Sequence, residues 1–154
     1  NNAVKNDILE ALKYAKNDDQ LATVISHEVA HALARHGAER VTQGMIQQGV
    51  GLIGSVAVAA TAPQYQNAFN QAYGLGSNLG VMLPYGRMQE SEADEIGIYL
   101  MHKAGYNVNE ATKFWENMSE GKSGGNDFFS THPSSQNRTK DIQTVINKIG
   151  NEAK

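Results

Sequence analysis

The stretch that decides the fold is His27-Glu28-Val29-Ala30-His31, a His-Glu-x-x-His signature in the first third of the chain. On an α-helix, residues four apart share one face, so both imidazoles can reach a single metal ion. Glu28 lies about 100° round the same helix and faces the same cavity. This arrangement is typical of zinc hydrolases, in which the glutamate acts as a general base.

The residues around the signature predict that it lies inside a helix. Asp18 and Asp19 supply acidic capping residues, and an apolar helical rhythm follows them. Nothing breaks this rhythm before Gly37. We therefore expect a helix from about Asp19 to Arg35 or His36, with Gly37 as its C-terminal stop.

A hydrolytic zinc site also needs a third protein ligand and an open position for water. The chain has no cysteine, so the ligands must be histidines or carboxylates. The best candidates lie in residues 87–95, which follow Pro84 and lead into an apolar helical run. Glu90 and Asp94 are four residues apart, so one can bind the metal while the other accepts the spare ring N–H of a ligand histidine.

A third element is Thr131-His132-Pro133, followed by Arg138 at the start of an amphipathic C-terminal helix. A histidine on a loop that a following proline restrains can lean over an active site. Peptide hydrolysis by zinc-bound water develops an oxyanion, which needs a donor or cation nearby.

These three elements, in this order, resemble the M48 family of zinc metallopeptidases, which includes mitochondrial, prenyl-protein-processing and bacterial envelope proteases. The resemblance covers about residues 20–150 and rests on residues 21–31, on the pattern R-x-x-E-x-E-A-D at residues 87–94 and on Thr131-His132-Pro133. It implies a mainly α, zincin-like (gluzincin) fold with little or no β-sheet. It also implies a zinc-dependent endopeptidase with one Zn²⁺ per chain and protein or peptide substrates.

The resemblance also implies roles for individual residues. The implied zinc ligands are His27, His31 and Glu90, and the implied general base is Glu28. Glu92 is the competing choice for the third ligand, but the family pattern places the ligand four residues before the aspartate, which favours Glu90.

Three further residues are implied to support the chemistry. Asp94 would be the hydrogen-bond partner of a ligand histidine, and His132 would approach the metal or the oxyanion. Arg138 would support the site. The location implied is a bacterial periplasm or cell envelope, with a role in protein quality control.

Related enzymes carry a strand before the metal helix, which pairs with the substrate backbone. Residues 1–15 instead predict a short helix, so we expect this strand to be missing or remodelled. The alternative functions are a zinc-binding, chaperone-like module that does not cleave, and a latent protease in which residues 63–84 or His132 block the metal. Both predict bound zinc with little turnover.

Composition limits the other possibilities. At 154 residues, the chain is long enough to form one metallopeptidase domain over residues 1–154. The net charge of −3 gives no electrostatic basis for nucleic-acid binding. The start at Asn1, without an initiator methionine or a secretory signal, predicts that the chain is an N-terminally truncated part of a longer protein. The oligomeric state cannot be read from the sequence.

One apolar stretch runs from Gly49 to Ala62 and ends at Pro63, which is shorter than the roughly 20 residues that cross a bilayer. We predict a buried helix there, and the alternative is a partly exposed hairpin with peripheral membrane contact. Residues 63–84 lie between the two halves of the metal site, and their position suggests a lid or plug over the cleft.

Periodicity and breakers together predict the remaining elements. Helices are expected at about 4–15, 38–62 with a break near Gly49, 86–104 and 109–119, the last burying Ala111, Phe114, Trp115 and Met118. A short helix is expected around 65–73 and a flexible loop at 121–126.

Overall fold

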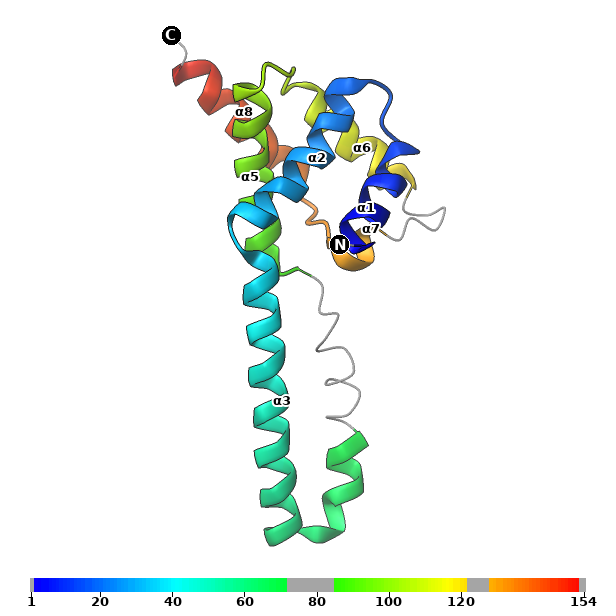
Figure 1. The fold of residues 1–154 in the computed structure, drawn as a ribbon, viewed down its shortest axis with the longest axis vertical. Helices are drawn as coiled ribbons and strands as arrows, with labels where there is room; N and C mark the ends of the chain where they lie inside the picture. Colours follow the sequence, from blue (N-terminus) through cyan, green and yellow to red (C-terminus); the bar gives the residue numbers. More distant parts are fainter. Residues whose placement is uncertain (1, 72–84, 122–127, 153–154) are drawn as a thin grey trace. The chain divides into compact units, whose positions relative to one another are not determined.

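The computed structural model describes residues 2–71, 85–121 and 128–152, and its regular elements are helices (Figure 1). They are α1 (Asn2–Leu12), α2 (Asp18–Leu33), α3 (His36–Thr61), η1 (Pro63–Tyr65), α5 (Arg87–Lys103), α6 (Glu110–Gly121), α7 (Phe128–Thr131) and α8 (Arg138–Glu152), with a further helical stretch at 66–71. Within those ranges there is no strand, so the prediction of a mainly α fold is confirmed.

Contacts between residues divide the chain into two compact units. Unit 1 comprises Asn1–Ala34 and Pro84–Lys154, and unit 2 comprises Arg35–Leu83. The proposed metal site belongs entirely to unit 1. The predicted domain boundaries, 1–154, stay a prediction.

The core of unit 1 forms around α2 and α5, which pack against each other more extensively than any other pair, with α6 and α8 against them. Its buried apolar side chains include the four that the sequence predicts on α6: Ala111, Phe114, Trp115 and Met118. Gly97 lets α2 and α5 approach closely, because a Cβ at this position would lie 3.2 Å from the backbone nitrogen of His27. Burial of these apolar side chains is the main force that fixes the two ligand-bearing helices together.

The ends of α2 differ from the prediction. Asn17, rather than an aspartate, caps the N-terminus by accepting a hydrogen bond from the Gln20 N–H at 2.8 Å. The helix ends at Leu33, and Arg35 takes the left-handed conformation with φ 60° before α3 begins at His36. Gly37 is therefore a residue of α3, and the prediction that it stops the metal helix is wrong.

Unit 2 contains α3, which is continuous through Gly49, so the predicted break there is also wrong. The predicted short helix is confirmed at 66–71, which follows η1 and returns along α3 (Figure 1). The prediction that the apolar stretch is buried is wrong, since Leu52 is 70% and Ile53 72% exposed. Most of the proposed lid, residues 72–84, lies outside the described residues, as do residues 122–126 of the predicted flexible loop.

Candidate metal centre

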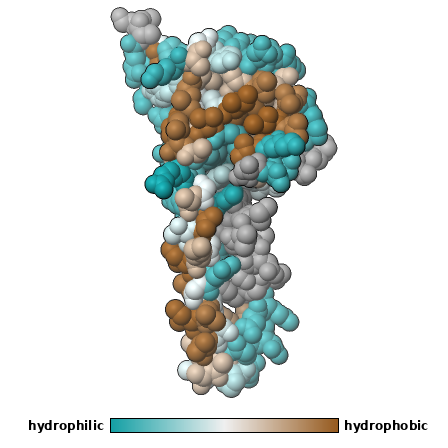
Figure 2. Space-filling model, viewed as in Figure 1, coloured by the Kyte–Doolittle hydropathy of each residue, from teal (hydrophilic) through white to brown (hydrophobic). Residues whose placement is uncertain are grey.

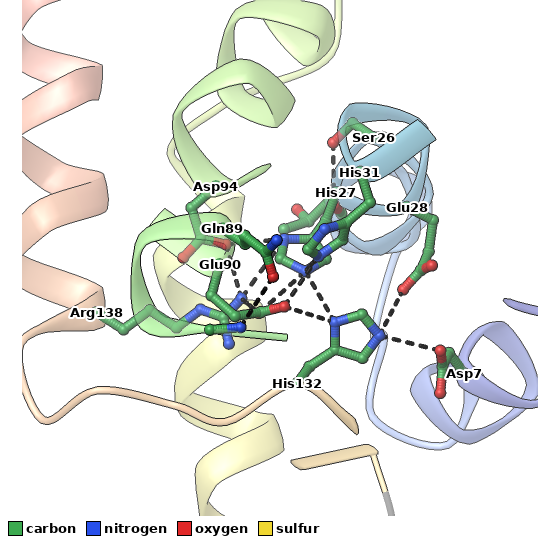
Figure 3. A network of polar contacts seen from close by, with 12 residues as sticks. Asp7, Ser26, His27, Glu28, His31, Gln89, Glu90, Asp94, His132 and Arg138 are labelled. Carbon is green, nitrogen blue, oxygen red and sulfur yellow. Dashed lines mark hydrogen bonds and ion pairs between the residues drawn. The ribbon is translucent and has the colours of Figure 1, made fainter. Parts of the chain in front are cut away.

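Helix α2 presents His27 and His31 on one face, as the four-residue spacing predicts (Figure 3). Their Nε2 atoms lie 3.0 Å apart, and both side chains are buried. Glu28 is also buried, at 7% exposure. Its Oε1 atom has no hydrogen-bond partner.

Helix α5 supplies two carboxylates to the same point. Glu90 places Oε1 2.9 Å from Nε2 of His31 and Oε2 3.2 Å from Nε2 of His27. Asp94, one turn later, accepts the Nδ1–H of His27 through Oδ1 at 2.9 Å. That hydrogen bond holds the His27 ring with Nε2 directed at the carboxylate of Glu90. Glu92 is exposed on another face of α5 and belongs to neither contact.

His132 follows α7 and is completely buried. Its ring stacks on Phe128, with centroids 4.4 Å apart, and its backbone N–H donates to the Phe128 carbonyl. Nδ1 lies 2.8 Å from Glu90 Oε1, whereas Nε2 lies 3.1 Å from Glu28 Oε1. The imidazole of His132 therefore lies between the carboxylates of Glu28 and Glu90 (Figure 3).

Asp7 on α1 is a member of the site that the sequence did not reveal. Its Oδ2 accepts a hydrogen bond from His132 Nε2 at 3.0 Å, whereas the contact of the same nitrogen with Glu28 lacks hydrogen-bond geometry. Asp7 and Ala11 are the buried residues of α1 and lie four positions apart. An acidic residue at a buried helical position is the local signal that could have pointed to Asp7. Tyr85 was also missed, and its ring stacks on His31 with centroids 3.9 Å apart.

Arg138 closes the site from the first turn of α8. Its Nη2 donates to Asp94 Oδ1 at 2.7 Å and to Glu90 Oε2 at 3.2 Å. The guanidinium lies over the Trp115 ring, 3.5 Å from its centroid. Asp94 thus links the guanidinium to the imidazole of His27, and a buried cation compensates the carboxylates of α5.

The surroundings shift the ionisation of these groups in opposite directions. Burial raises the pKa of Glu90, but its contacts with His132, His27 and His31 lower that pKa far more, well below the usual range of a carboxyl. Burial lowers the pKa of His31, and the net shift is downward. A histidine with a lowered pKa is neutral at pH 7 and can bind a metal without losing a proton.

The pKa of His132 moves the other way. Burial lowers it, but the carboxylates of Asp7, Glu28 and Glu90 raise it to about 11. Burial raises the pKa of Asp94, but the charge of Arg138 and the contacts with His27 and Arg138 together lower that pKa by more. Asp94 is therefore ionised when it accepts the hydrogen bond from the Nδ1–H of His27.

These residues fit a zinc ion. One nitrogen or oxygen atom from each of His27, His31, Glu90 and His132 lies within 4.8 Å of the other three, and all four residues are buried. Imidazole and carboxylate are the ligands that Zn²⁺ accepts when no thiolate is available. The separation between the two Nε2 atoms is compatible with two bonds of about 2.0–2.1 Å to one ion.

The model of peptidase family M48 matches residues 3–146. The chain belongs to peptidase family M48. This confirms the resemblance inferred from the signature, the carboxylate pattern of α5 and the His-Pro element. No solved structure gives a significant match.

Over the segments that align, relatives in this family are about a third identical to the chain. The mitochondrial metalloendopeptidase OMA1 of Schizosaccharomyces pombe is 38% identical over 86% of this chain, and that of Arabidopsis thaliana is 38% identical over 84%. The beta-barrel assembly-enhancing protease of Escherichia coli is 29% identical over 89% of the chain. The chain spans only 38%, 25% and 29% of the lengths of these three relatives, respectively.

Proposed function

We propose that the chain carries the catalytic site of a zinc metalloendopeptidase that hydrolyses peptide bonds in protein substrates. The observation that carries this proposal is the convergence of His27, His31 and Glu90, with the buried carboxylate of Glu28 beside them. Membership of family M48 and the names of the relatives, which are metalloendopeptidases and a protease, support it.

In this proposal His27, His31 and Glu90 hold the metal. Zinc bound there would lower the pKa of a water molecule to about 7 and polarise the scissile carbonyl. Glu28 would take the proton from the attacking water and later give it to the leaving amine, and its Oε1, which accepts no hydrogen bond, is open to this exchange. Asp94 keeps the His27 ring in the orientation that ligation needs.

The decisive experiment is Glu28→Gln, compared with the exposed Glu92→Gln as a matched control. We expect Glu28→Gln to retain one zinc per chain and to lose nearly all cleavage of a casein-type substrate, because the amide cannot accept the proton. Glu92→Gln should retain both zinc and activity. Normal turnover by Glu28→Gln would contradict the assignment of the general base.

The position of His132 favours a second function, a latent protease. Its ring lies between Glu28 and Glu90, in the space where a water molecule would stand for attack. In that case His132 is a ligand that must leave before hydrolysis, rather than the donor to the oxyanion. We expect His132→Ala to increase turnover if the protein is latent and to decrease it if His132 stabilises the oxyanion. A zinc-binding module that does not cleave would stay inactive in both forms.

A role in envelope protein quality control is the finer part of the proposal. It is supported by the name of the Escherichia coli relative, which refers to the assembly of β-barrels, and by the exposed apolar helix of unit 2. Depletion of the protein should then increase the amount of misassembled envelope proteins in the source organism, and zinc-site variants should fail to correct it. An unchanged envelope proteome would contradict this part.

A further inference from the structure

Unit 2 carries an apolar surface that the peptidase chemistry does not use. The sequence from residue 41 to residue 86 contains no Asp, Glu, Lys, Arg or His. Within it, α3 exposes seven large apolar side chains to at least 56%: Val41, Met45, Ile46, Val50, Leu52, Ile53 and Val56. Figure 2 shows patches of hydrophobic colour along this helix. Soluble surfaces rarely leave apolar side chains in so continuous a row.

Some polar side chains of this hairpin bond to one another between its two helical segments. Ser55 on α3 donates to Asn70 Oδ1 at 3.1 Å and accepts from Gln66 Nε2 at 2.7 Å. Thr61 turns its hydroxyl back to the carbonyl of Ala57. Glycine brings the two helices together, since a Cβ at Gly54 would lie 2.7 Å from the ring of Phe69. Hydrogen bonds within the hairpin and small residues at its seam are what a lipid environment favours.

The dimensions of α3 also match a bilayer. Its 26 residues extend about 39 Å, whereas the hydrocarbon core is about 30 Å thick. It is a helix long and apolar enough to cross a membrane. Arg35 immediately precedes α3 and Arg40 lies near its start. Tyr65, which is 62% exposed, lies just beyond the far end of α3, and aromatic side chains are enriched at the depth of lipid headgroups.

We propose that α3 and the helical stretch 66–71 insert into a lipid bilayer as a hairpin and attach the peptidase to a membrane. A protein partner, including a second copy of this chain, excludes charge only from the centre of its interface and tolerates a polar, charged rim. A bilayer excludes charge from every face and along the whole depth. The absence of charge from residues 41–86, on all sides of α3, therefore favours lipid.

Flotation tests this proposal on the whole chain. Purified protein is mixed with vesicles of uncharged phosphatidylcholine and centrifuged through a density gradient. We expect the wild type to float with the lipid and the double variant Leu52→Glu, Ile53→Glu to float about tenfold less or worse, because two charges enter the hydrocarbon core. The matched control is Leu9→Glu with Leu12→Glu, which adds the same charges at exposed leucines of α1, 49% and 48% exposed.

The control should float like the wild type, and circular dichroism should show helix content unchanged in both double variants. A wild type that stays in the dense fractions overturns the proposal. A wild type that dimerises without floating also overturns it, and assigns the apolar face to a second copy. The readout needs no peptidase activity, so its failure leaves the proposed function untouched.

Depth can be measured separately, because the chain has no cysteine of its own. A fluorophore attached to Ile53→Cys should be quenched by nitroxide on the lipid acyl chains, whereas one on Glu116→Cys, an exposed position of α6, should not. Equal quenching at both positions, or none at Ile53→Cys, contradicts insertion of α3.

Discussion

Replacement of Arg138 tests whether burial, rather than distance, decides the value of an ion pair in this protein. Arg138 Nη2 lies 2.7 Å from Asp94 Oδ1, and the two side chains are 5% and 10% exposed. On the surface, Lys113 and Glu110 are 2.8 Å apart, but Lys113 is 62% exposed. Breaking a buried pair on one side leaves a charge without a partner. We therefore expect Arg138→Met to lower the free energy of unfolding by about 3–5 kcal/mol, and Lys113→Met to change it little.

Urea denaturation in a metal chelator, followed by circular dichroism, measures both variants. A double variant, Arg138→Met with Asp94→Leu, extends the test because packed apolar side chains can replace a buried pair at little cost. We expect it to recover most of the stability. It should not recover zinc affinity, since the His27 Nδ1–H would lack its acceptor. Equal losses for Arg138→Met and Lys113→Met would refute the reasoning.

Three further predictions concern the metal site and its support. Glu90→Ala should reduce zinc affinity by more than the roughly 10–100-fold that loss of a supporting residue costs, while Glu92→Ala should leave the zinc content measured by metal analysis unchanged. Gly97→Val should lower the free energy of unfolding, measured by urea titration, by about 1–3 kcal/mol through overpacking against the backbone of α2. The control is Gly49→Val, where no atom lies within 4 Å of the added Cβ, and it should lower the free energy of unfolding by less. The third prediction concerns pH and is tested in a chelator. The pKa of His132 is about 11 in the folded protein and 6.5 in the unfolded chain. The protonated ring therefore contributes its full stabilisation below about pH 6.5, and this stabilisation is lost as the pH rises towards 11. The denaturation midpoint should therefore fall from pH 7 to pH 10, and His132→Gln should remove most of that fall.

Much of the candidate site could be predicted because its geometry is local. His27 and His31, and likewise Glu90 and Asp94, are four residues apart on single helices, so helical periodicity places each pair on one face. Spacing alone could not reveal Asp7, which meets His132 although the two residues are 125 positions apart in sequence. That contact depends on how α1 packs against α7, which is a property of the whole fold.

The fold was predictable at the level of its helices but not of their surroundings. Apolar periodicity indicates a helix at residues 49–62, but it cannot say whether that helix meets protein or lipid. The predicted end of α2 was wrong for a different reason. Glycine ordinarily takes the left-handed position after a helix, and here Arg35 takes it, two residues before Gly37. Such a conformation costs a non-glycine residue about 1–2 kcal/mol and must be offset by the packing on either side.

The close approach of α2 and α5 at Gly97 also bears on how this family can diverge. At Gly97, α5 lies against the backbone of Ser26 and His27, so this contact limits how closely the two ligand-bearing helices can pack. A larger residue at position 97 would push α5 away from α2 and so move Glu90 relative to His31. The proposed metal site therefore constrains which residue can occupy position 97, in addition to the constraint from packing.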